Sequence, residues 1–441
     1  MRRCVGVELG GYSIGAVMTS ADKPDSPLDR MSVPPVLVTA PGMGALVGAQ
    51  AEQFAASGVG AVFRDFYGRV GDPVPVVGSD GSARLGADLV AMTIGGLLRQ
   101  GTGGSDIAQV VIAHPSGWGP YEMSVLHSAL TCTEAEGAPT SMVSIPVAAV
   151  TAAVAAGAMS CSETVVVADV GACGTEVALV TGAPNHVGRL QAISRTDDLS
   201  SAGLDRALAR HVLEQVRGHL PDSNFANRAN RATVRDVITA SRRARQELVR
   251  HTSTVVNVCL PAQCIPVRIV RAEFESLARE PIDAGLSTIA HIMQQAREKG
   301  IEINAVVLTG EVARTPLLAE LISAQWSCRP IIPASPEWAA ASGAAHIAVR
   351  RSSTRTSTPL SPAHPKASIS QHPQSAQSKA APYRGMPSVR HARPPAERKW
   401  TLRWGALQVT AALTSTTPSP RYEPFADAPR SRTWRGDKST G

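Results

Sequence analysis

The sequence predicts an α/β protein built from two similar halves and followed by a disordered tail. Hydrophobic residues make up 44% of the 441 residues but aromatic residues only 4%, so the core must be built from Ala, Val, Leu and Ile. Runs of β-branched residues alternate with segments of helical period, as in α/β folds. A strand that ends in an acid and a glycine turn, followed by a second strand, occurs once in each half.

The first half contains three expected strands and two expected helices. Strands are predicted over 4–10, 14–19 and 108–115 because apolar and β-branched residues dominate there. Apolar residues recur at helical spacing over 85–100, and small residues do so over 147–160.

The second half begins with the strand, turn and strand of residues 165–180. We expect two amphipathic helices to follow, over 200–220 and 233–252, and then two paired strands over 254–261 and 264–270. A helix with a proline interruption is predicted over 271–300, and a buried strand over 303–310.

Positive charge is concentrated at the C-terminal end. Residues 351–441 hold 15 Lys and Arg against 4 Asp and Glu, whereas residues 1–350 hold 28 against 32. A basic groove for specific nucleic-acid binding inside the fold is therefore not expected, and attraction to an anionic membrane or an acidic protein belongs to the tail.

The tail is predicted to lack a packed core, because 12 of the 32 prolines fall in its 91 residues. We expect a Pro/Ser/Arg-rich linker over 351–400 and a basic tail over 401–441. Its apolar run, 404–413, is about half of the ~20 residues that a membrane-spanning helix needs. An interfacial segment, or part of a longer anchor, stays open.

The seven cysteines are scattered and form no CxxC pair, which argues against structural zinc and a disulfide framework. Cys259 and Cys264 are predicted to be buried, reduced thiols in neighbouring strands. The first ten residues run directly into a strand and turn, without the pattern of a signal peptide. These features predict a cytoplasmic protein, with peripheral membrane association left open.

The repeated segments are "VGVELGGYSIGAV" and "VVVADVGACGTEVALV". Glu8 precedes Gly10 by two positions, as Asp169 precedes Gly171. Two such turns that face each other across a cleft would clamp a polyphosphate, with the two acids holding a divalent cation through water. The alternative is that each acid caps a plain hairpin.

With these motifs in this order, the chain resembles the actin-like ATPase superfamily, and most closely the nucleotide-binding domain of the 70-kilodalton heat-shock chaperones. Five further segments are similar to that domain, namely 144–157, 202–215, 242–261, 305–322 and 337–345. The resemblance covers roughly residues 3–348. It implies a domain over 1–350 with two lobes, about 1–160 and 161–350, each with a ribonuclease-H-like sheet, and ATP or ADP with Mg²⁺ in the cleft.

In that family the first turn carries Asp, Gly and two hydroxyl residues. The resemblance places the metal-holding acid on Glu8 and the phosphate contacts on Gly10, Gly11 and Tyr12, so that the hydroxyl pair is lost. The family's catalytic lysine falls on Arg64, which keeps the charge with a different geometry. A solvated surface charge is the alternative for Arg64.

In the second turn Asp169 and Gly171 match the family. Ala172 and Cys173 replace glycines, and the family's threonine falls on Gly174. The resemblance implies that this turn also binds phosphate and that Asp169 holds Mg²⁺ through water.

The glutamate that positions the attacking water in the family falls on Ile145, which cannot do acid–base work. Thr175 is one residue from the missing threonine and could substitute for it. An active ATPase would need Thr175 together with a base that the motifs do not show.

On the adenosine side, the family's glutamate and lysine fall on Arg242 and Arg245. Gly310 is kept, Glu311 replaces the second glycine, and Arg314 is placed to stack on the adenine. The alternatives are that both helix arginines form one exposed face and that Gly310 serves only the strand-to-helix turn.

The sequence therefore predicts a degenerate ATP-binding protein, a pseudo-ATPase that lacks the family's peptide-binding domain, since a Pro/Ser/Arg tail follows Arg350. The layout is similar to that of actinobacterial proteins associated with type VII secretion, which implies a regulatory role with an unknown protein partner. An active ATPase and a non-enzymatic scaffold with an empty cleft are the alternatives.

Overall fold

Two five-stranded sheets with the same strand order form the centre of the fold. The computed structural model describes residues 2–20, 29–103, 106–132, 137–182, 188–219, 228–260 and 263–356. The first sheet has the order β10–β9–β1–β2–β3, with strands β1 (Arg3–Leu9), β2 (Ile14–Ser20), β3 (Asp29–Val33), β9 (Ile107–His114) and β10 (Thr140–Ser144). The second has the order β13–β12–β11–β16–β17, with strands β11 (Val165–Val170), β12 (Thr175–Thr181), β13 (Arg189–Thr196), β16 (Ala305–Thr309) and β17 (Arg329–Ile331).

Each sheet joins an antiparallel meander of three strands to two parallel strands. β1 pairs antiparallel with β2 and parallel with β9, and β11 pairs in the same way with β12 and β16. The strand–turn–strand segment that occurs twice in the sequence therefore forms the same hairpin at the same place in both sheets. The predicted α/β class is confirmed.

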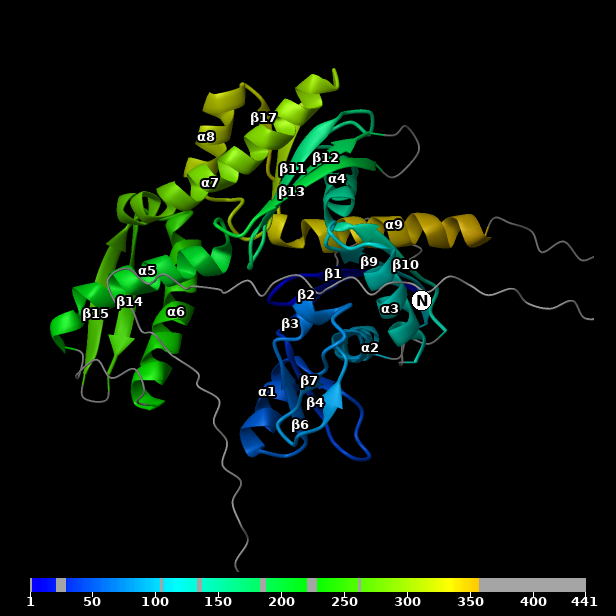
Figure 1. The fold of residues 1–441 in the computed structure, drawn as a ribbon, viewed down its shortest axis with the longest axis horizontal. Coiled ribbons are helices and arrows are strands. Elements are labelled where there is room, and N and C mark those ends of the chain that lie inside the picture. The colour runs from blue at the N-terminus through cyan, green and yellow to red at the C-terminus, as the bar shows by residue number, and fades with distance from the viewer. Residues whose placement is uncertain are drawn as a thin grey trace, which may run out of the picture. The chain divides into compact units, whose positions relative to one another are not determined.

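Two helices of small residues pack between the sheets. In Figure 1, α4 (Ile145–Ala155) lies against α9 (Ala339–Thr356), and α9 also packs on β1 and β9. A Cβ placed on Gly343 would lie 1.7 Å from the carbonyl oxygen of Ala148, and one on Gly6 would lie 2.1 Å from that of Ala341. Glycine at these two positions is what allows α9 to approach both neighbours so closely.

Additional elements extend each half. The first half adds β4 (Val36–Thr39), β5 (Leu46–Val47), α1 (Gly48–Ser57), β6 (Ala61–Arg64), η1 (Tyr67–Arg69), β7 (Val76–Val77), β8 (Ala83–Arg84), α2 (Gly86–Thr102) and α3 (Pro120–Thr131). The second half adds α5 (Ser201–Gln215), η2 (Arg217–His219), α6 (Arg228–Leu248), β14 (Ser253–Cys259), β15 (Cys264–Val270), α7 (Arg271–Glu298), α8 (Pro316–Trp326) and η3 (Pro336–Trp338).

The proline interruption predicted for residues 271–300 does not occur. Helix α7 continues through Pro281 over 28 residues. Ala278 and Ile282, on either side of the proline, are fully buried in the core. The packing of this apolar face holds the helix together where Pro281 removes one backbone hydrogen bond.

The prediction for Cys259 and Cys264 was wrong. The two residues lie opposite each other in the antiparallel β14–β15 pair, with Cα atoms 4.1 Å apart, and form a disulfide. Both are exposed rather than buried. Directly opposed positions of a hairpin bring two side chains close enough to bond, and this register is not visible in the cysteine spacing.

The predicted linker 351–400 lies outside the described residues from residue 357 onward, as does the whole of the predicted tail 401–441 with its apolar run. Within the described part of the chain, no helix is both long and apolar enough to cross a membrane.

Candidate functional site

The first turn joins β1 to β2. The N–H of Gly10 donates to the carbonyl oxygen of Ser13 at 3.1 Å, and a Cβ on Gly10 would lie 2.8 Å from the same oxygen. Glu8, half-buried near the end of β1, accepts a hydrogen bond from the N–H of Ala341 in α9 at 3.2 Å. The Tyr12 side chain is 47% exposed. The turn is thus tight and needs glycine, and its acid points toward the connecting helices.

The second turn joins β11 to β12 and lies against the start of α5. The N–H of Gly171 donates to the carbonyl oxygen of Gly174 at 2.9 Å. The carbonyl oxygens of Gly171 and Ala172 accept from Ser201 and Ala202 at 3.0 and 3.3 Å. The first turn of α5 therefore fixes the position of this loop.

The two turns meet in space although their acids, Glu8 and Asp169, are 161 positions apart in the chain. A Cβ on Gly11 would lie 2.7 Å from Cys173 Sγ, so the thiol of the second turn packs on the first. Burial, and then the charge of Asp169, raise the pKa of Glu8 to about 8. Burial raises the pKa of Asp169 to about 6, although Thr309 donates a hydrogen bond to its Oδ1 at 2.8 Å. The structure thus brings together the two acids that the sequence singled out.

A row of polar residues crosses the second sheet beside these acids. Asp169 lies opposite Thr309 in β16 and Glu176 in β12, and Glu176 lies opposite Arg195 in β13. Residues at opposed positions project from the same face of a sheet, so these four form one line. The sequence reasoning missed Glu176 and Arg195, although a lone charge in the apolar strand "TEVALVT" was a usable signal.

The loop after β9 contacts this row from the first half of the chain. Both carboxylate oxygens of Glu176 accept from the N–H of Ser116, at 3.1 and 3.4 Å. Burial raises the pKa of Glu176. His114, which ends β9, stacks on Trp118 with ring centroids 5.8 Å apart. The two halves are therefore hydrogen-bonded to each other directly beside the second turn.

On the adenosine side, the predicted residues form an ion-pair network with one another. Arg245 is 1% exposed; its guanidinium donates to Asp205 Oδ1 at 2.6 Å and to Glu311 Oε2 at 3.1 Å. Arg242, which is half-exposed, also pairs with Glu311. Arg245 is therefore not part of an exposed helix face, which was the alternative interpretation of the two arginines. Asp205, which completes the network, was missed because it lies 40 residues away on α5.

Gly310 has a backbone requirement of its own. Its φ is +84°, and a Cβ there would lie 2.2 Å from the carbonyl oxygen of Val170. Arg314 donates to the carbonyl oxygen of Ala334 and lies 3.4 Å from Glu337. The guanidinium predicted to stack on adenine is thus held by protein groups.

Two predicted residues are engaged elsewhere. Arg64 forms a two-bond pair with Glu52, at 3.2 and 3.0 Å, on the surface of the β4–β6 sheet. Thr175 is buried, and its hydroxyl donates to the carbonyl oxygen of Leu199 at 2.7 Å. Ile145 is buried in an apolar cluster with residues of β1, β9 and α9.

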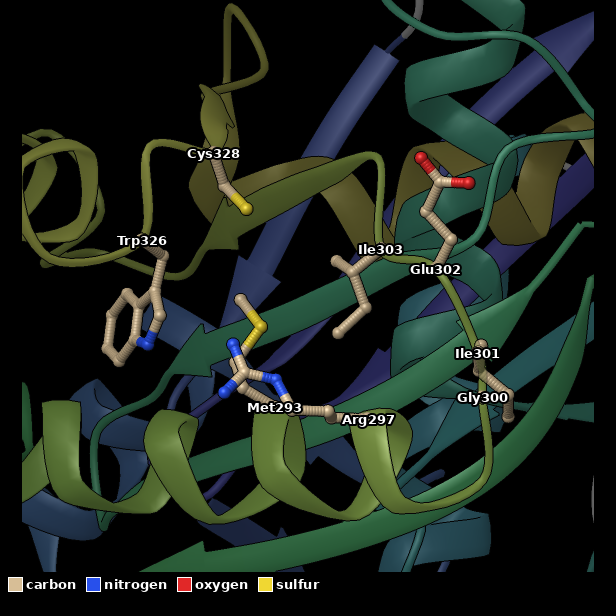
Figure 2. Close-up of a pocket in the computed structure, with 8 residues that line it drawn as sticks. All are labelled: Met293, Arg297, Gly300, Ile301, Glu302, Ile303, Trp326 and Cys328. Carbon is tan, nitrogen blue, oxygen red and sulfur yellow. The ribbon is translucent and has the colours of Figure 1, made fainter.

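A cavity of about 340 Å³ lies elsewhere, where the end of α7 approaches β16 and the α8–β17 connection (Figure 2). Its lining consists of Met293, Arg297, Gly300, Ile301, Glu302, Ile303, Trp326 and Cys328. It shares no residue with either turn and is not the predicted nucleotide site.

Comparison with known proteins agrees with this geometry. The family described as "Hsp70 protein" matches residues 142–360, which include α4, the whole second sheet and α9. Over these residues the chain is similar to the Hsp70 family. The resemblance inferred from the sequence is confirmed, and with it the actin-like ATPase fold that Hsp70 domains have.

Two curated relatives are chaperones. A chaperone protein HscA homolog from Methylibium petroleiphilum is 26% identical over 111 residues, which is 25% of this chain and 18% of the relative. Chaperone protein dnaK3 from Synechococcus elongatus is 25% identical over 190 residues, which is 42% of this chain and 25% of the relative. The chain thus spans about a quarter or less of the length of these relatives.

The phosphate side of the site fits the Mg²⁺ and nucleotide that Hsp70 domains bind. Glu8 and Asp169 are half-buried acids with raised pKa values, an arrangement that a divalent cation between them would stabilise. Bound there, Mg²⁺ would neutralise charge on the phosphate oxygens. The adenosine side does not fit in the same way, because Arg242 and Arg245 are neutralised by protein carboxylates.

Proposed function

We propose that this chain binds the polyphosphate of ATP or ADP with Mg²⁺ between its two turns and hydrolyses ATP very slowly or not at all. One relationship carries the proposal: Glu8 and Asp169 come together from the two turns. Glycines at positions 10 and 171 let a phosphate approach each turn closely because they carry no side chain, while their own N–H groups donate to Ser13 and Gly174 within the turns.

The loss of hydrolysis is supported by the surroundings of Ile145. Its side chain is 6% exposed and packs among apolar residues such as Val111 and Ala148. The hydroxyl of Thr175 is bonded to Leu199 and is not directed at the turns. Position 145, where an active ATPase would need an acid, and the hydroxyl of Thr175, which could replace the missing threonine, are therefore both buried in the core.

The test is equilibrium binding of ATP and ADP to the full chain, with and without Mg²⁺, alongside phosphate release. The proposal predicts Mg²⁺-dependent binding with release near the background rate. Binding that is indifferent to Mg²⁺ would contradict the role of the two acids.

A scaffold that binds no nucleotide is the second candidate, and a specific observation favours it. Cys173 packs directly on Gly11, and the ion pairs of Arg242 and Arg245 are complete without a ligand. Absence of ATP and ADP binding at millimolar concentration would select this candidate.

The basic region 351–441 supports a further proposal about partners. Its excess of 15 basic over 4 acidic residues favours weak, salt-sensitive association with anionic membrane or an acidic protein, such as a component of a secretion machinery. Co-sedimentation with anionic vesicles should fall as salt rises. Binding that persists after deletion of residues 351–441 would contradict this proposal.

A further inference from the structure

The proposed site needs positive charge near the phosphates, and the arginine expected to provide it is elsewhere. Arg64 is paired through two hydrogen bonds with Glu52. A polyphosphate between two carboxylates requires cations in addition to Mg²⁺, because like charges at close range repel strongly in a partly buried site.

Arg195 lies at the second turn. It is opposite Glu176 in the β12–β13 pair, and Glu176 is opposite Asp169 in the β11–β12 pair. All three side chains therefore leave the same face of the sheet. A Cβ placed on Gly174 would lie 3.1 Å from Nη2 of Arg195, which puts the guanidinium directly against the turn.

The charge of Arg195 acts on the groups of this turn. Burial raises the pKa of Asp169, Glu176 and Cys173, and the positive charge of Arg195 opposes the rise at all three. The guanidinium of Arg195 thus acts electrostatically on both acids of the second sheet and on the thiol of the turn.

The present partner of Arg195 is exchangeable. The guanidinium pairs with Asp197 at 3.1 Å, with side chains that are 54% and 79% exposed. Exposed pairs of this kind contribute little, at most about 1 kcal/mol. A phosphate, which accepts two parallel N–H bonds from arginine, can displace the carboxylate of Asp197.

We propose that Arg195 is the phosphate-binding cation of this site, in the place that the sequence resemblance gives to Arg64. The ligand group is a phosphate of a nucleoside di- or triphosphate. This inference rests on the proposed function, and it names the residue that recognises the anion.

The experiment is calorimetric titration of Mg-ATP into the full chain and its variants. Arg195→Ala should weaken binding about 10- to 100-fold, the range for loss of a charge-assisted bond. Arg195→Lys keeps the charge but cannot donate two parallel hydrogen bonds, so its affinity for Mg-ATP should lie between those of wild type and Arg195→Ala. Asp197→Asn, which frees the guanidinium, should bind as tightly as wild type or more tightly.

Two variants control for charge alone. Arg64→Ala removes the residue assigned by resemblance, and Arg210→Ala removes an exposed arginine of α5. Both should keep the wild-type affinity within about twofold, because screened surface charges act weakly at a distance.

The possible results distinguish the role of Arg195 from nucleotide binding by the chain as a whole. No ATP binding by wild type would overturn the proposed function itself. Wild-type binding that is equally tight in Arg195→Ala and Arg195→Lys would overturn the role of Arg195, as would a large loss in Arg64→Ala. Melting temperatures without ligand establish that each variant is folded, and Arg195→Lys decides the question if Arg195→Ala is unstable.

Discussion

The guanidinium of Arg245 donates from Nε to Oδ1 of Asp205 at 2.6 Å, and both side chains are buried. This pair joins α5 to α6, and Glu311 adds a second carboxylate to the same guanidinium. At the place where the Hsp70 resemblance puts adenosine contacts, the protein thus supplies its own counter-charges.

Removing Asp205 should destabilise the fold strongly. Asp205→Ala leaves a buried guanidinium with one carboxylate fewer, and breaking a buried pair in this way costs about 3–5 kcal/mol. Chemical denaturation measures the loss. The matched control is Asp283→Ala, which removes an exposed pair with Arg279 and should change stability by less than about 1 kcal/mol. Equal effects of the two variants would show that the Arg245 pair is not buried in solution.

Stability should fall as pH rises through the range set by Glu8, measured in the presence of a chelator. Its pKa is raised from 4.5 to about 8, so the folded protein holds this proton more tightly than the unfolded chain. The resulting stabilisation is complete below the unfolded pKa and is lost as pH approaches the folded value. Glu8→Gln cannot titrate and should show a shallower loss between about pH 5 and pH 8. Identical slopes for the two proteins would contradict the raised pKa.

Gly343→Ala should separate the two central helices. The added Cβ would lie 1.7 Å from the carbonyl oxygen of Ala148, and overpacking of this kind costs about 1–3 kcal/mol or more. Gly218→Ala is the control, since nothing lies within 4 Å of its added Cβ. We expect a clear drop in melting temperature for the first variant alone. A neutral Gly343→Ala would mean that α4 and α9 are not in close contact.

Ile145→Glu tests whether the missing acid limits hydrolysis. Supplying a positioning group is expected to raise turnover about tenfold or more, although burial of the new carboxyl lowers stability by about 2 kcal/mol or more. Ile145→Gln has the same shape without the base and should stay at the wild-type rate. If both variants are equally slow while folded, another defect limits the reaction.

Much of the fold could be predicted because its strands, helices and turns depend on the pattern of residues close together in the sequence. The hairpins that hold Glu8 and Asp169 are visible as two β-branched runs around an acid and a glycine turn, and their recurrence indicated that the two turns act together. The disulfide could not be predicted, because it depends on the register that places Cys259 opposite Cys264.

The electrostatics of the site depended on partners far apart in the chain. The spacing of residues does not show that Arg245 meets Asp205, that Arg64 meets Glu52, or that β13 brings Arg195 to the second turn. Charges that look free in a motif are neutralised by whichever carboxylates the topology brings near. Sequence motifs therefore predicted the two hairpin turns and their acids, but not the carboxylates that pair with the arginines.

The most direct test of the central claim is one paired measurement on the full chain, thermal unfolding with Mg-ATP and steady-state phosphate release in the same buffer. Mg-ATP should raise the melting temperature of wild type, Asp169→Ala should abolish that rise, and phosphate release should stay near background, because Ile145 stands where the resemblance places the water-positioning acid. Phosphate release at a rate of the order of 1 s⁻¹ or faster, within the usual range of enzymes, would contradict the account of this chain as an ATP-binding protein without effective hydrolysis.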